Sequence, residues 1–311
     1  MTEIWTMGEL LAEVMRPERD MPLDHVGPFV GPFPSGAPGI FIDTVARLGH
    51  SGAIISGVGD DGFGAAIMAR LTRDGVRTDF IDVVAGRSTG VAFVAYAADG
   101  SRQFIFHWAG TPAVMARVPP ASAVVGARYL HVMGCSLLPD EAFRGRLTET
   151  VELFAAGGAN ISFDPNIRME LDGARSIEAI VTPILRRCSI LMPGAAELLV
   201  LGGGTDLDAA AGALMRRFPL QLIVVKLGGR GCRIYEGDHR TDIPAFQVDE
   251  VDPTGAGDCF DAGFLCGLLE GRSPVDAARM AAAVGALAAG AFGPMEGDIG
   301  PASVEAMLGR R

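Results

Sequence analysis

Short apolar runs alternate with amphipathic segments along most of the chain. The runs are rich in Val, Ile, Leu and Phe, which predicts buried strands at residues 52–56, 129–133, 161–163, 189–192 and 220–226. Apolar residues at helical spacing predict helices at residues 41–48, 64–74, 140–156, 207–218, 259–270 and 274–290. Apolar strands that alternate with helices form parallel sheets covered on both faces. We therefore expect the α/β class, with a doubly wound, mostly parallel sheet flanked by helices.

Two segments depart from this alternation. Residues 89–96 and 101–106 flank an Asp99-Gly100 turn, which predicts a β-hairpin. Together with a Pro- and Gly-rich segment at residues 21–38, the hairpin is expected to form a small β-sheet. This sheet would form a lid over the edge of the main sheet, built from about residues 12–34 and 88–108.

The composition favours a single domain that spans residues 1–311. Hydrophobic residues make up 49% of the chain, enough to fill a core without disulfides or metals. The five cysteines form no Cys-x-x-Cys pair, which argues against a zinc site or a disulfide framework and favours a reducing cytoplasm. A net charge of -11 disfavours a nucleic-acid partner, and no apolar run is long enough to predict a membrane span.

A glycine-rich turn directly before an apolar helical run carries the candidate chemistry. Gly255, Ala256 and Gly257 have little or no side chain, so several amide groups can converge at a helix N-terminus and bind an anion. Asp258 would place a carboxylate in the same turn, where it could accept a proton from a hydroxyl. The alternative interpretation is structural: the glycines make a tight turn and Asp258 caps its helix.

The wider string VDPTGAGDCFDAG resembles the signature DTxGAGDxFxxG of the ribokinase-like (PfkB) carbohydrate kinases. The resemblance implies an ATP-dependent carbohydrate kinase that uses Mg²⁺ and transfers phosphate to a primary hydroxyl. It implies that Asp258 is the catalytic base and that Gly255, Ala256 and Gly257 form the anion hole.

The resemblance extends to the N-terminal part of the chain. Residues 7–13 are similar to the family's opening strand, which implies that Glu13 contacts the sugar where the family usually has Asp. The strings SGAPGI and ARLG resemble the family segment GGAPANVAxxxARLG, which implies sugar contacts at Gly36 and Ala37. Ile40 stands where the family usually carries an Asn that binds the sugar.

Two further motifs border the expected phosphate path. The string DPNIR is similar to the family element D-x-N-x-R, which implies roles for Asn166 and Arg168 beside the phosphates. The string PGAAE lies at the place of the family's PNxxE motif, which implies that Glu197 contributes to magnesium and phosphate binding. Gly194 replaces the Asn of that motif.

A strand end and a turn match the part of the family's site that lies beside the nucleotide. Lys226, Gly228 and Gly231 match the family's strand end and turn beside the nucleotide. Asp252 and Thr254 align with positions that hold a monovalent cation such as K⁺ in some members. Their alternative role is to shape the turn.

Other classes of protein remain as alternatives. The string GVGDDG at residues 57–62 satisfies the dinucleotide fingerprint GxGxxG, which an NAD-dependent oxidoreductase would use. The family resemblance explains the same residues as a loop beside the sugar. A non-catalytic sugar-binding protein also remains open because of Ile40 and Gly194.

The substrate pattern favours a neutral ketohexose, tagatose or fructose. Kinases of 2-keto-3-deoxygluconate in this family carry a Tyr-x-Arg element after the lid hairpin, whereas this chain has Phe106-His-Trp. The sugar acid stays an alternative because Arg102 or Arg168 could meet a carboxylate. Phe106 is a candidate for stacking on the sugar. An unpaired lid edge further predicts a homodimer formed through the lid.

Overall fold

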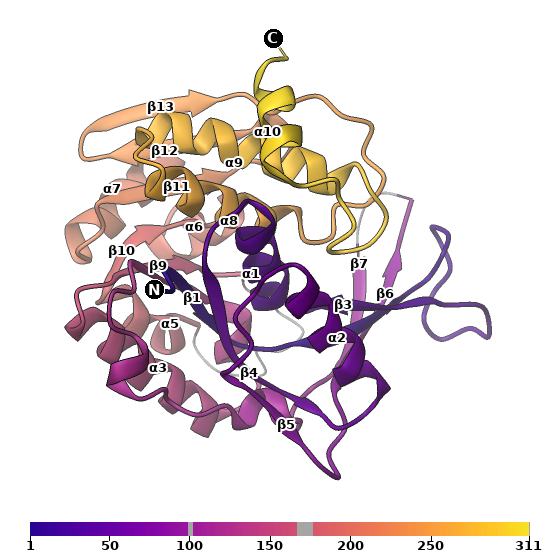
Figure 1. Ribbon diagram of the computed structural model, residues 1–311. Coiled ribbons are helices and arrows are strands. Elements are labelled where there is room, and N and C mark those ends of the chain that lie inside the picture. The colour runs from indigo at the N-terminus through magenta and orange to yellow at the C-terminus, as the bar shows by residue number, and fades with distance from the viewer. Residues whose placement is uncertain (99–101, 167–176, 311) are drawn as a thin grey trace.

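The computed structural model describes residues 1–98, 102–166 and 177–310, and it contains a nine-stranded main sheet (Figure 1). The strand order is β13-β12-β11-β10-β9-β8-β1-β4-β5, parallel from β11 to β5 and antiparallel at β12 and β13. The strands are β1 (Ile4–Met7), β4 (Gly52–Gly59), β5 (Ile81–Val84), β8 (Tyr129–Met133), β9 (Asn160–Asp164), β10 (Cys188–Leu191), β11 (Leu222–Lys226), β12 (Cys232–Glu236) and β13 (His239–Ile243). This mostly parallel sheet confirms the predicted fold class.

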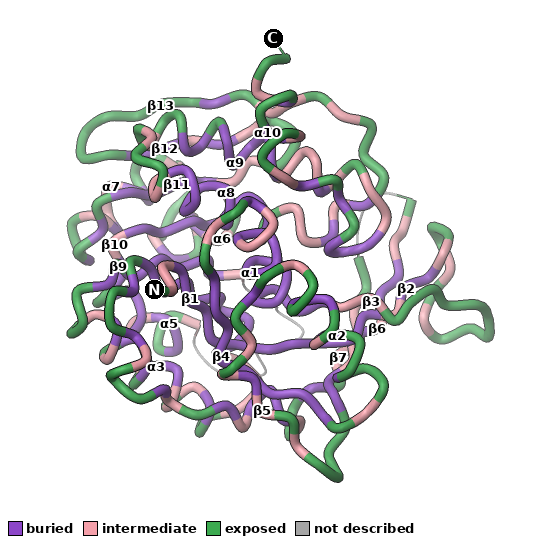
Figure 2. The backbone as a smooth tube through the Cα atoms, viewed as in Figure 1, coloured by how far each residue is buried: buried purple, intermediate pink, exposed green. Residues whose placement is uncertain are grey.

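Helices cover both faces of the main sheet and bury two hydrophobic clusters (Figure 2). Ile4 and Trp5 are neighbours in β1 yet belong to opposite clusters, because successive side chains of a strand point to opposite faces. The helices are α1 (Ala37–Arg47), α2 (Gly62–Arg73), α3 (Glu141–Ala156), α5 (Ile177–Leu185), α6 (Ala195–Gly202), α7 (Leu207–Arg217), α8 (Ala256–Leu269), α9 (Pro274–Ala289) and α10 (Pro301–Leu308). Within the described residues no single helix is long and apolar enough to cross a membrane; only α6 and α7 taken together, with a 54° bend between them, reach that length and composition.

A separate four-stranded sheet projects from one side of the main sheet, at the right of Figure 1. Its order is β3-β2-β6-β7, with β2 and β6 parallel and the two outer pairs antiparallel. Its strands are β2 (Leu11–Met15), β3 (Val30–Ser35), β6 (Gly90–Tyr96) and β7 (Arg102–His107). The predicted strands of the hairpin are therefore present, while the predicted turn at residues 99–101 lies outside the described residues.

The structure corrects the opening strand expected at residues 7–13. The chain leaves the main sheet at Met7 and enters the small sheet at Leu11, so the segment belongs to two strands in two sheets. Gly8 makes this crossing possible, because a Cβ there would lie 2.4 Å from Oγ of Ser136 and 2.5 Å from Cγ of Pro38. The crossing places the residues after Gly8 at the junction of the two sheets.

Candidate active site

The turn that leads into α8 has a backbone that favours glycine. Gly255, the residue before the helix, has φ +76° in the left-handed region. A Cβ there would lie 2.7 Å from the carbonyl oxygen of Pro294 and 3.0 Å from Cγ2 of Ile40. Ala256 and Gly257 begin the helix, where the first amides have no acceptor further back in the helix. These amides and the helix dipole make the turn suitable for an anion.

Asp258 lies in the same first turn, between two cavities. It is 7% exposed. Gly255 and Asp258 line a smaller cavity of about 50 Å³, which reaches the small sheet. Ala256 and Gly257 line a larger cavity of about 260 Å³ on the other side. The first turn of α8 is thus the wall between the two cavities, with a carboxylate set into it.

The smaller cavity collects the residues that the sequence predicts to bind the sugar. They are Glu13, Gly36, Ala37, Phe106 and Asp258. Glu13 comes from β2, and its Oε2 accepts a hydrogen bond of 2.6 Å from Oγ of Ser35. Gly36 has φ +99°, and a Cβ there would lie 2.4 Å from the carbonyl oxygen of Glu9. Residues of the small sheet therefore meet the start of α1 and the first turn of α8 at this cavity.

Glu9 is a buried carboxylate of the smaller cavity that the sequence analysis did not single out. It is 4% exposed and lies in the crossing between β1 and β2. Its Oε2 accepts a hydrogen bond of 2.5 Å from Oγ of Ser136, and its Oε1 accepts one of 3.2 Å from Sγ of Cys135. The sequence offered one signal for Glu9: it is an acidic residue that follows a glycine at the end of a buried strand.

The larger cavity contains the residues predicted to lie beside the nucleotide. Lys226, Gly228 and Gly231 line it opposite the first turn of α8. Both glycines have positive φ, +60° and +95°. Part of the wall is apolar and made largely of small residues: Phe260, Ala282, Gly285 and Ala286. A small-residue apolar slot beside a helix N-terminus suits a purine base whose phosphates point to the amides.

Lys226, the only lysine of the chain, holds two buried carboxylates together. Its Nζ lies 2.8 Å from Oδ2 of Asp164 and 3.0 and 3.2 Å from the two oxygens of Asp261. Burial opposes the charge, but the two carboxylates outweigh it and hold the pKa of Lys226 above its usual range. Burial raises the pKa of Asp261 and lowers that of the adjacent His131 to about 3. The lysine charge is therefore already engaged within the protein.

Asn166 connects this cluster to Asp258. Its backbone has φ +38°, and its amide donates a hydrogen bond of 3.2 Å to Oδ1 of Asp164. Its Nδ2 lies 3.5 Å from Oδ1 of Asp258. The predicted phosphate ligand Arg168 lies outside the described residues. Lys226, Asp164 and Asn166 thus form a chain of contacts that ends at the candidate base.

Glu197 lies in the first turn of α6 and interacts with the turn before it. Its Oε2 accepts a hydrogen bond of 2.7 Å from the amide of Gly194. The amide of Lys226 donates to the carbonyl oxygen of Pro193 at 2.8 Å, so this turn lies beside the end of β11. Glu197 does not line the larger cavity within the described residues. Its role in magnesium binding stays a prediction.

A model of the pfkB family of carbohydrate kinases matches residues 8–299. The chain belongs to this family. Fructokinase-1 of Oryza sativa subsp. japonica is 30% identical over 302 residues, which cover 91% of this chain and 90% of the relative. These findings confirm the predicted kinase family.

Two solved structures agree over nearly the full length. An E. coli protein described as a Ribokinase II, in complex with ATP and Mg²⁺, superposes with a TM-score of 0.93 at 34% identity and full coverage of both chains. A fructokinase of Xylella fastidiosa with bound ATP superposes with a TM-score of 0.87 at 26% identity, over 99% of this chain and 98% of that one. The protein is an ATP-dependent carbohydrate kinase with the predicted ribokinase-like fold.

The dinucleotide fingerprint at residues 57–62 has a structural cause in this kinase. A Cβ on Gly57 would lie 2.4 Å from the carbonyl oxygen of Pro112, and one on Gly59 would lie 2.3 Å from that of Arg87. Protein backbone, not a pyrophosphate, fills the space beside these glycines. The family match and this packing rule out the oxidoreductase alternative.

Asp252 and Thr254, the predicted cation ligands, lie buried in the turn before α8. Oδ1 of Asp252 accepts hydrogen bonds from N and Oγ1 of Thr254 at 2.9 and 2.6 Å, and from the hydroxyl of Tyr96 at 2.7 Å. Its Oδ2 accepts one of 2.9 Å from the amide of Gly293. Oδ1 thus accepts from three donors, more than its two lone pairs, while Oδ2 accepts from one. Oδ1 of Asp252 therefore has no acceptor site left for a potassium ion.

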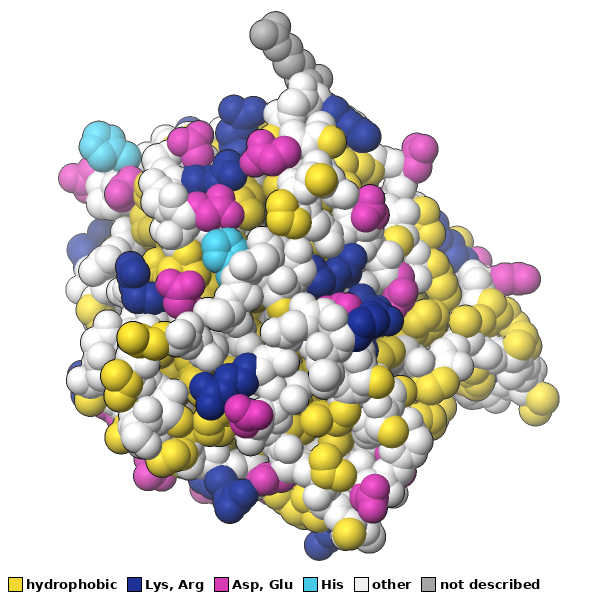
Figure 3. Space-filling view, in the orientation of Figure 1, with side chains coloured by type: hydrophobic (Ala, Val, Ile, Leu, Met, Phe, Trp, Pro, Cys, Tyr) yellow, Lys and Arg dark blue, Asp and Glu magenta, His cyan; other side chains and the backbone are white. Residues whose placement is uncertain are grey.

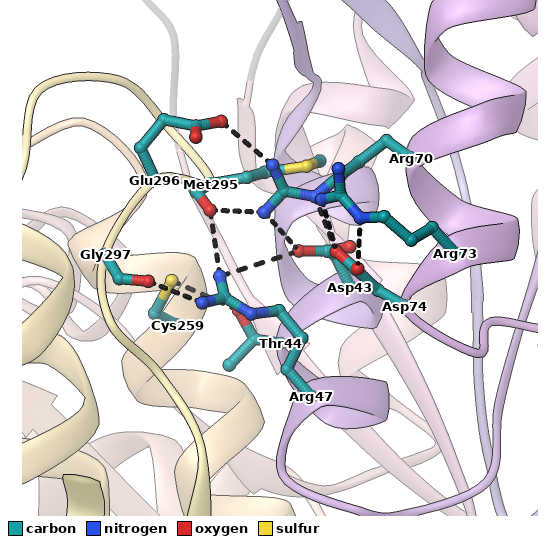
Figure 4. Close-up of polar contacts among 10 residues, drawn as sticks. All are labelled: Asp43, Thr44, Arg47, Arg70, Arg73, Asp74, Cys259, Met295, Glu296 and Gly297. Atoms are coloured by element: carbon teal, nitrogen blue, oxygen red, sulfur yellow. Dashed lines mark hydrogen bonds and ion pairs between the residues drawn. The ribbon is translucent and has the colours of Figure 1, made fainter.

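Arginines of α1 and α2 fix the loop after α9, which packs on the turn before α8 (Figure 4). Arg47 donates to the carbonyl oxygens of Met295 and Gly297 at 2.8 and 2.5 Å. Arg70 donates to the same oxygen of Met295 at 2.5 Å. Between them lies Asp43, with Oδ2 at 3.3 Å from Arg70 and 3.9 Å from Arg47. The two helices thus hold in place the loop that packs on the active-site turn.

Asp43 makes the stability of this kinase depend on pH. Burial raises its pKa from 3.8 to about 7, against the opposing charge of Arg70 and with the aid of Asp74. Between pH 3.8 and about 7, the folded protein therefore keeps a proton on Asp43 that the unfolded chain releases. The stability that comes from the raised pKa is lost as the pH rises through about 7. Compared with Asp43→Asn, the wild-type unfolding free energy should fall by up to about 1.4 kcal/mol per pH unit. Urea unfolding of both proteins from about pH 5 to about pH 8 measures this, and a constant difference contradicts it.

Proposed function

We propose that this kinase transfers the γ-phosphoryl group of ATP to a primary hydroxyl of a neutral ketohexose, fructose or tagatose. One observation carries the proposal: the first turn of α8 separates the two cavities. Gly255 and Asp258 face the smaller one, and Ala256 and Gly257 face the larger one. A sugar hydroxyl and a phosphoryl group that enter from opposite sides meet at this wall, as in-line transfer requires.

Asp258 is the proposed general base. Its carboxylate lines the smaller cavity, where it would take the proton of the attacking hydroxyl. The amides of Gly255, Ala256 and Gly257 would stabilise the charge of the transferring group, because the helix N-terminus orients them in advance. Asn166, at 3.5 Å from Asp258, would orient the base. The sugar oxygen attacks phosphorus directly, so no phospho-enzyme forms.

Magnesium is part of this proposal. Mg²⁺ prefers oxygen ligands and usually binds through one or two carboxylates together with the phosphates of the substrate. Glu197 and Asn166 offer a carboxylate and an amide oxygen, so their chemistry fits the ion. When bound, Mg²⁺ neutralises phosphate charge.

The charges of the smaller cavity favour a neutral sugar over a sugar acid. Three carboxylates line it, those of Glu9, Glu13 and Asp258. Arg102 is the one basic residue in the part of the lining that the structure describes, and it is exposed. Sugar hydroxyls can donate hydrogen bonds to carboxylates, whereas the carboxylate of 2-keto-3-deoxygluconate would be repelled by them.

The relatives support a ketohexose, and one substitution bears on which one. The rice and Xylella relatives are both named fructokinases. Ile40 replaces the family's usual sugar-binding Asn, and its side chain packs against Gly255. An isoleucine cannot hydrogen-bond a sugar hydroxyl. This kinase therefore binds its sugar through other polar groups than the Asn that the family usually has at this position. Tagatose is therefore as good a candidate as fructose.

A panel of acceptors tests the proposal. Release of ADP from ATP and magnesium is measured with fructose, tagatose, ribose, 2-keto-3-deoxygluconate and adenosine. We expect a ketohexose to exceed the sugar acid in kcat/KM by about 100-fold or more, because a buried charge repulsion costs several kcal/mol. A preference for 2-keto-3-deoxygluconate would contradict the neutral substrate while leaving the kinase class intact. Mass spectrometry of the product then shows a single added phosphate.

The small sheet has two further roles in the proposal. As a lid it would close over the sugar and exclude water, which otherwise competes as the acceptor. Hydrophobic side chains gather over its projecting end in Figure 3, where Val26, Phe29 and Val30 are exposed. This surface supports the expected homodimer through the lid.

All five cysteines are buried and free, which supports a cytoplasmic location.

A further inference from the structure

Tyr96 links the small sheet to the turn that forms the anion hole. It is the last residue of β6, and its hydroxyl donates a hydrogen bond of 2.7 Å to Oδ1 of Asp252, 156 residues further along the chain. The same hydroxyl contacts Oγ1 of Thr254. Thr254 directly precedes Gly255, the residue that sets the first turn of α8. A single side chain of the lid therefore touches the phosphate-binding turn.

The hydroxyl is one of four hydrogen-bond donors to a buried charge. Asp252 is 2% exposed, so each unfilled lone pair would carry a desolvation cost. Thr254 supplies two of its donors, and Gly293 supplies one to Oδ2. Tyr96 supplies the fourth. Burial raises the pKa of Tyr96, so its hydroxyl keeps the proton that it donates.

We propose that Tyr96 is a positioning residue of this kinase: its hydroxyl takes the place of a monovalent cation at Asp252, so turnover needs no potassium. The inference rests on the kinase activity but not on the identity of the sugar. A cation bound at this carboxylate would stabilise the turn before α8 through its charge. Here the turn is stabilised by a hydrogen bond from the lid.

The same contact couples the occupied sugar cavity to the anion hole. Strand β6 supplies Ala92 to the lining of the smaller cavity and Tyr96 to Asp252, so one strand reaches both. A second lid contact reaches the same region, because the rings of Phe33 in β3 and Phe292 lie 5.9 Å apart, edge to face. A sugar bound against β6 would therefore lie on the same strand as the hydroxyl that contacts the turn before α8.

The test compares wild type with Tyr96→Phe in potassium chloride and in choline chloride at equal ionic strength. Wild-type kcat should differ by less than about 2-fold between the two salts. In choline, the variant should lose about 10-fold or more in kcat with KM for ATP changed by less than about 3-fold, because a hydrogen bond to a buried charged group is lost. Potassium should restore part of the variant's kcat, since the space that the hydroxyl occupied beside Oδ1 of Asp252 is then open to an ion.

Tyr235→Phe is the matched control. The Tyr235 hydroxyl also donates to an aspartate, Oδ1 of Asp208 at 2.6 Å, but this pair does not line either active-site cavity. The control should keep the wild-type kcat in both salts. Three results would overturn the inference: strong potassium activation of the wild type, an unchanged kcat of Tyr96→Phe in choline, or a variant that stays equally slow in potassium.

Thermal unfolding gives a readout that needs no substrate. Potassium in place of choline should leave the melting temperature of wild type and of Tyr235→Phe unchanged and should raise that of Tyr96→Phe, because an ion that binds only the folded state stabilises it. A potassium-dependent rise in the wild type would overturn the inference. This measurement stands even if no sugar of the panel is phosphorylated, so failure of the proposed substrate and failure of this inference are distinguished.

Discussion

Asp258→Asn should lower the kcat of sugar phosphorylation by about 10²- to 10⁴-fold, the usual contribution of a positioned general base. Asparagine keeps the size of the side chain but cannot accept the proton of the hydroxyl. The amides of the first turn of α8 are left in place, so KM for ATP should change by only a few-fold. Steady-state kinetics with the preferred acceptor of the panel measures both constants.

Asp276→Asn is the matched control for this prediction. Asp276 is also an acidic residue in the first turn of a helix, α9, where it accepts the hydroxyl hydrogen of Ser273. Its loss removes a favourable interaction with a helix dipole, worth about 0.3–1 kcal/mol of stability, without touching either active-site cavity. If Asp258→Asn behaved like this control, Asp258 would be a helix cap and the mechanism would be wrong.

The fold was largely predictable because strong local patterns agree with the tertiary structure. The apolar run at residues 129–133 coincides with β8, since a strand buried on both faces needs no alternation. Helix α8 begins at Ala256, three residues before the predicted start, because glycine and a buried aspartate hide the helical periodicity there. The strands β12 and β13 were missed, since β13 lies on the sheet edge with mostly exposed residues.

The site was predictable only where its residues are neighbours in the sequence. Gly255 and Asp258 belong to one contiguous motif, and the sequence assigns them together. The contacts of Glu9 with Ser136 and of Tyr96 with Asp252 span 127 and 156 residues. No periodicity or spacing reports such pairs, because they arise when the two sheets pack against the loops around α8. The polar partners of Glu9 and Tyr96 are therefore known only from the structure.

Lys226 is a clear case of a residue whose environment changes its expected role. The sequence predicts a ligand of the nucleotide, but its Nζ is held between Asp164 and Asp261. Their side chains are 4% and 0% exposed, so removal of the lysine charge leaves two carboxylates buried without their cation. Breaking a buried ion pair from one side typically costs about 3–5 kcal/mol. Lys226→Met should therefore destabilise the protein by about that amount, measured by urea unfolding.

Two variants separate this cost from other effects of the substitution. Arg233→Met is the matched control, because Arg233 also pairs with two carboxylates, Asp208 and Asp242, but at the surface, where the loss should be about 0–1 kcal/mol. Adding Asp261→Leu to Lys226→Met should recover part of the stability, because one of the two stranded carboxylates is gone. A Lys226→Met protein of nearly wild-type stability with a large rise in KM for ATP would show the opposite: the ammonium group would then serve the nucleotide, as the sequence alone predicts.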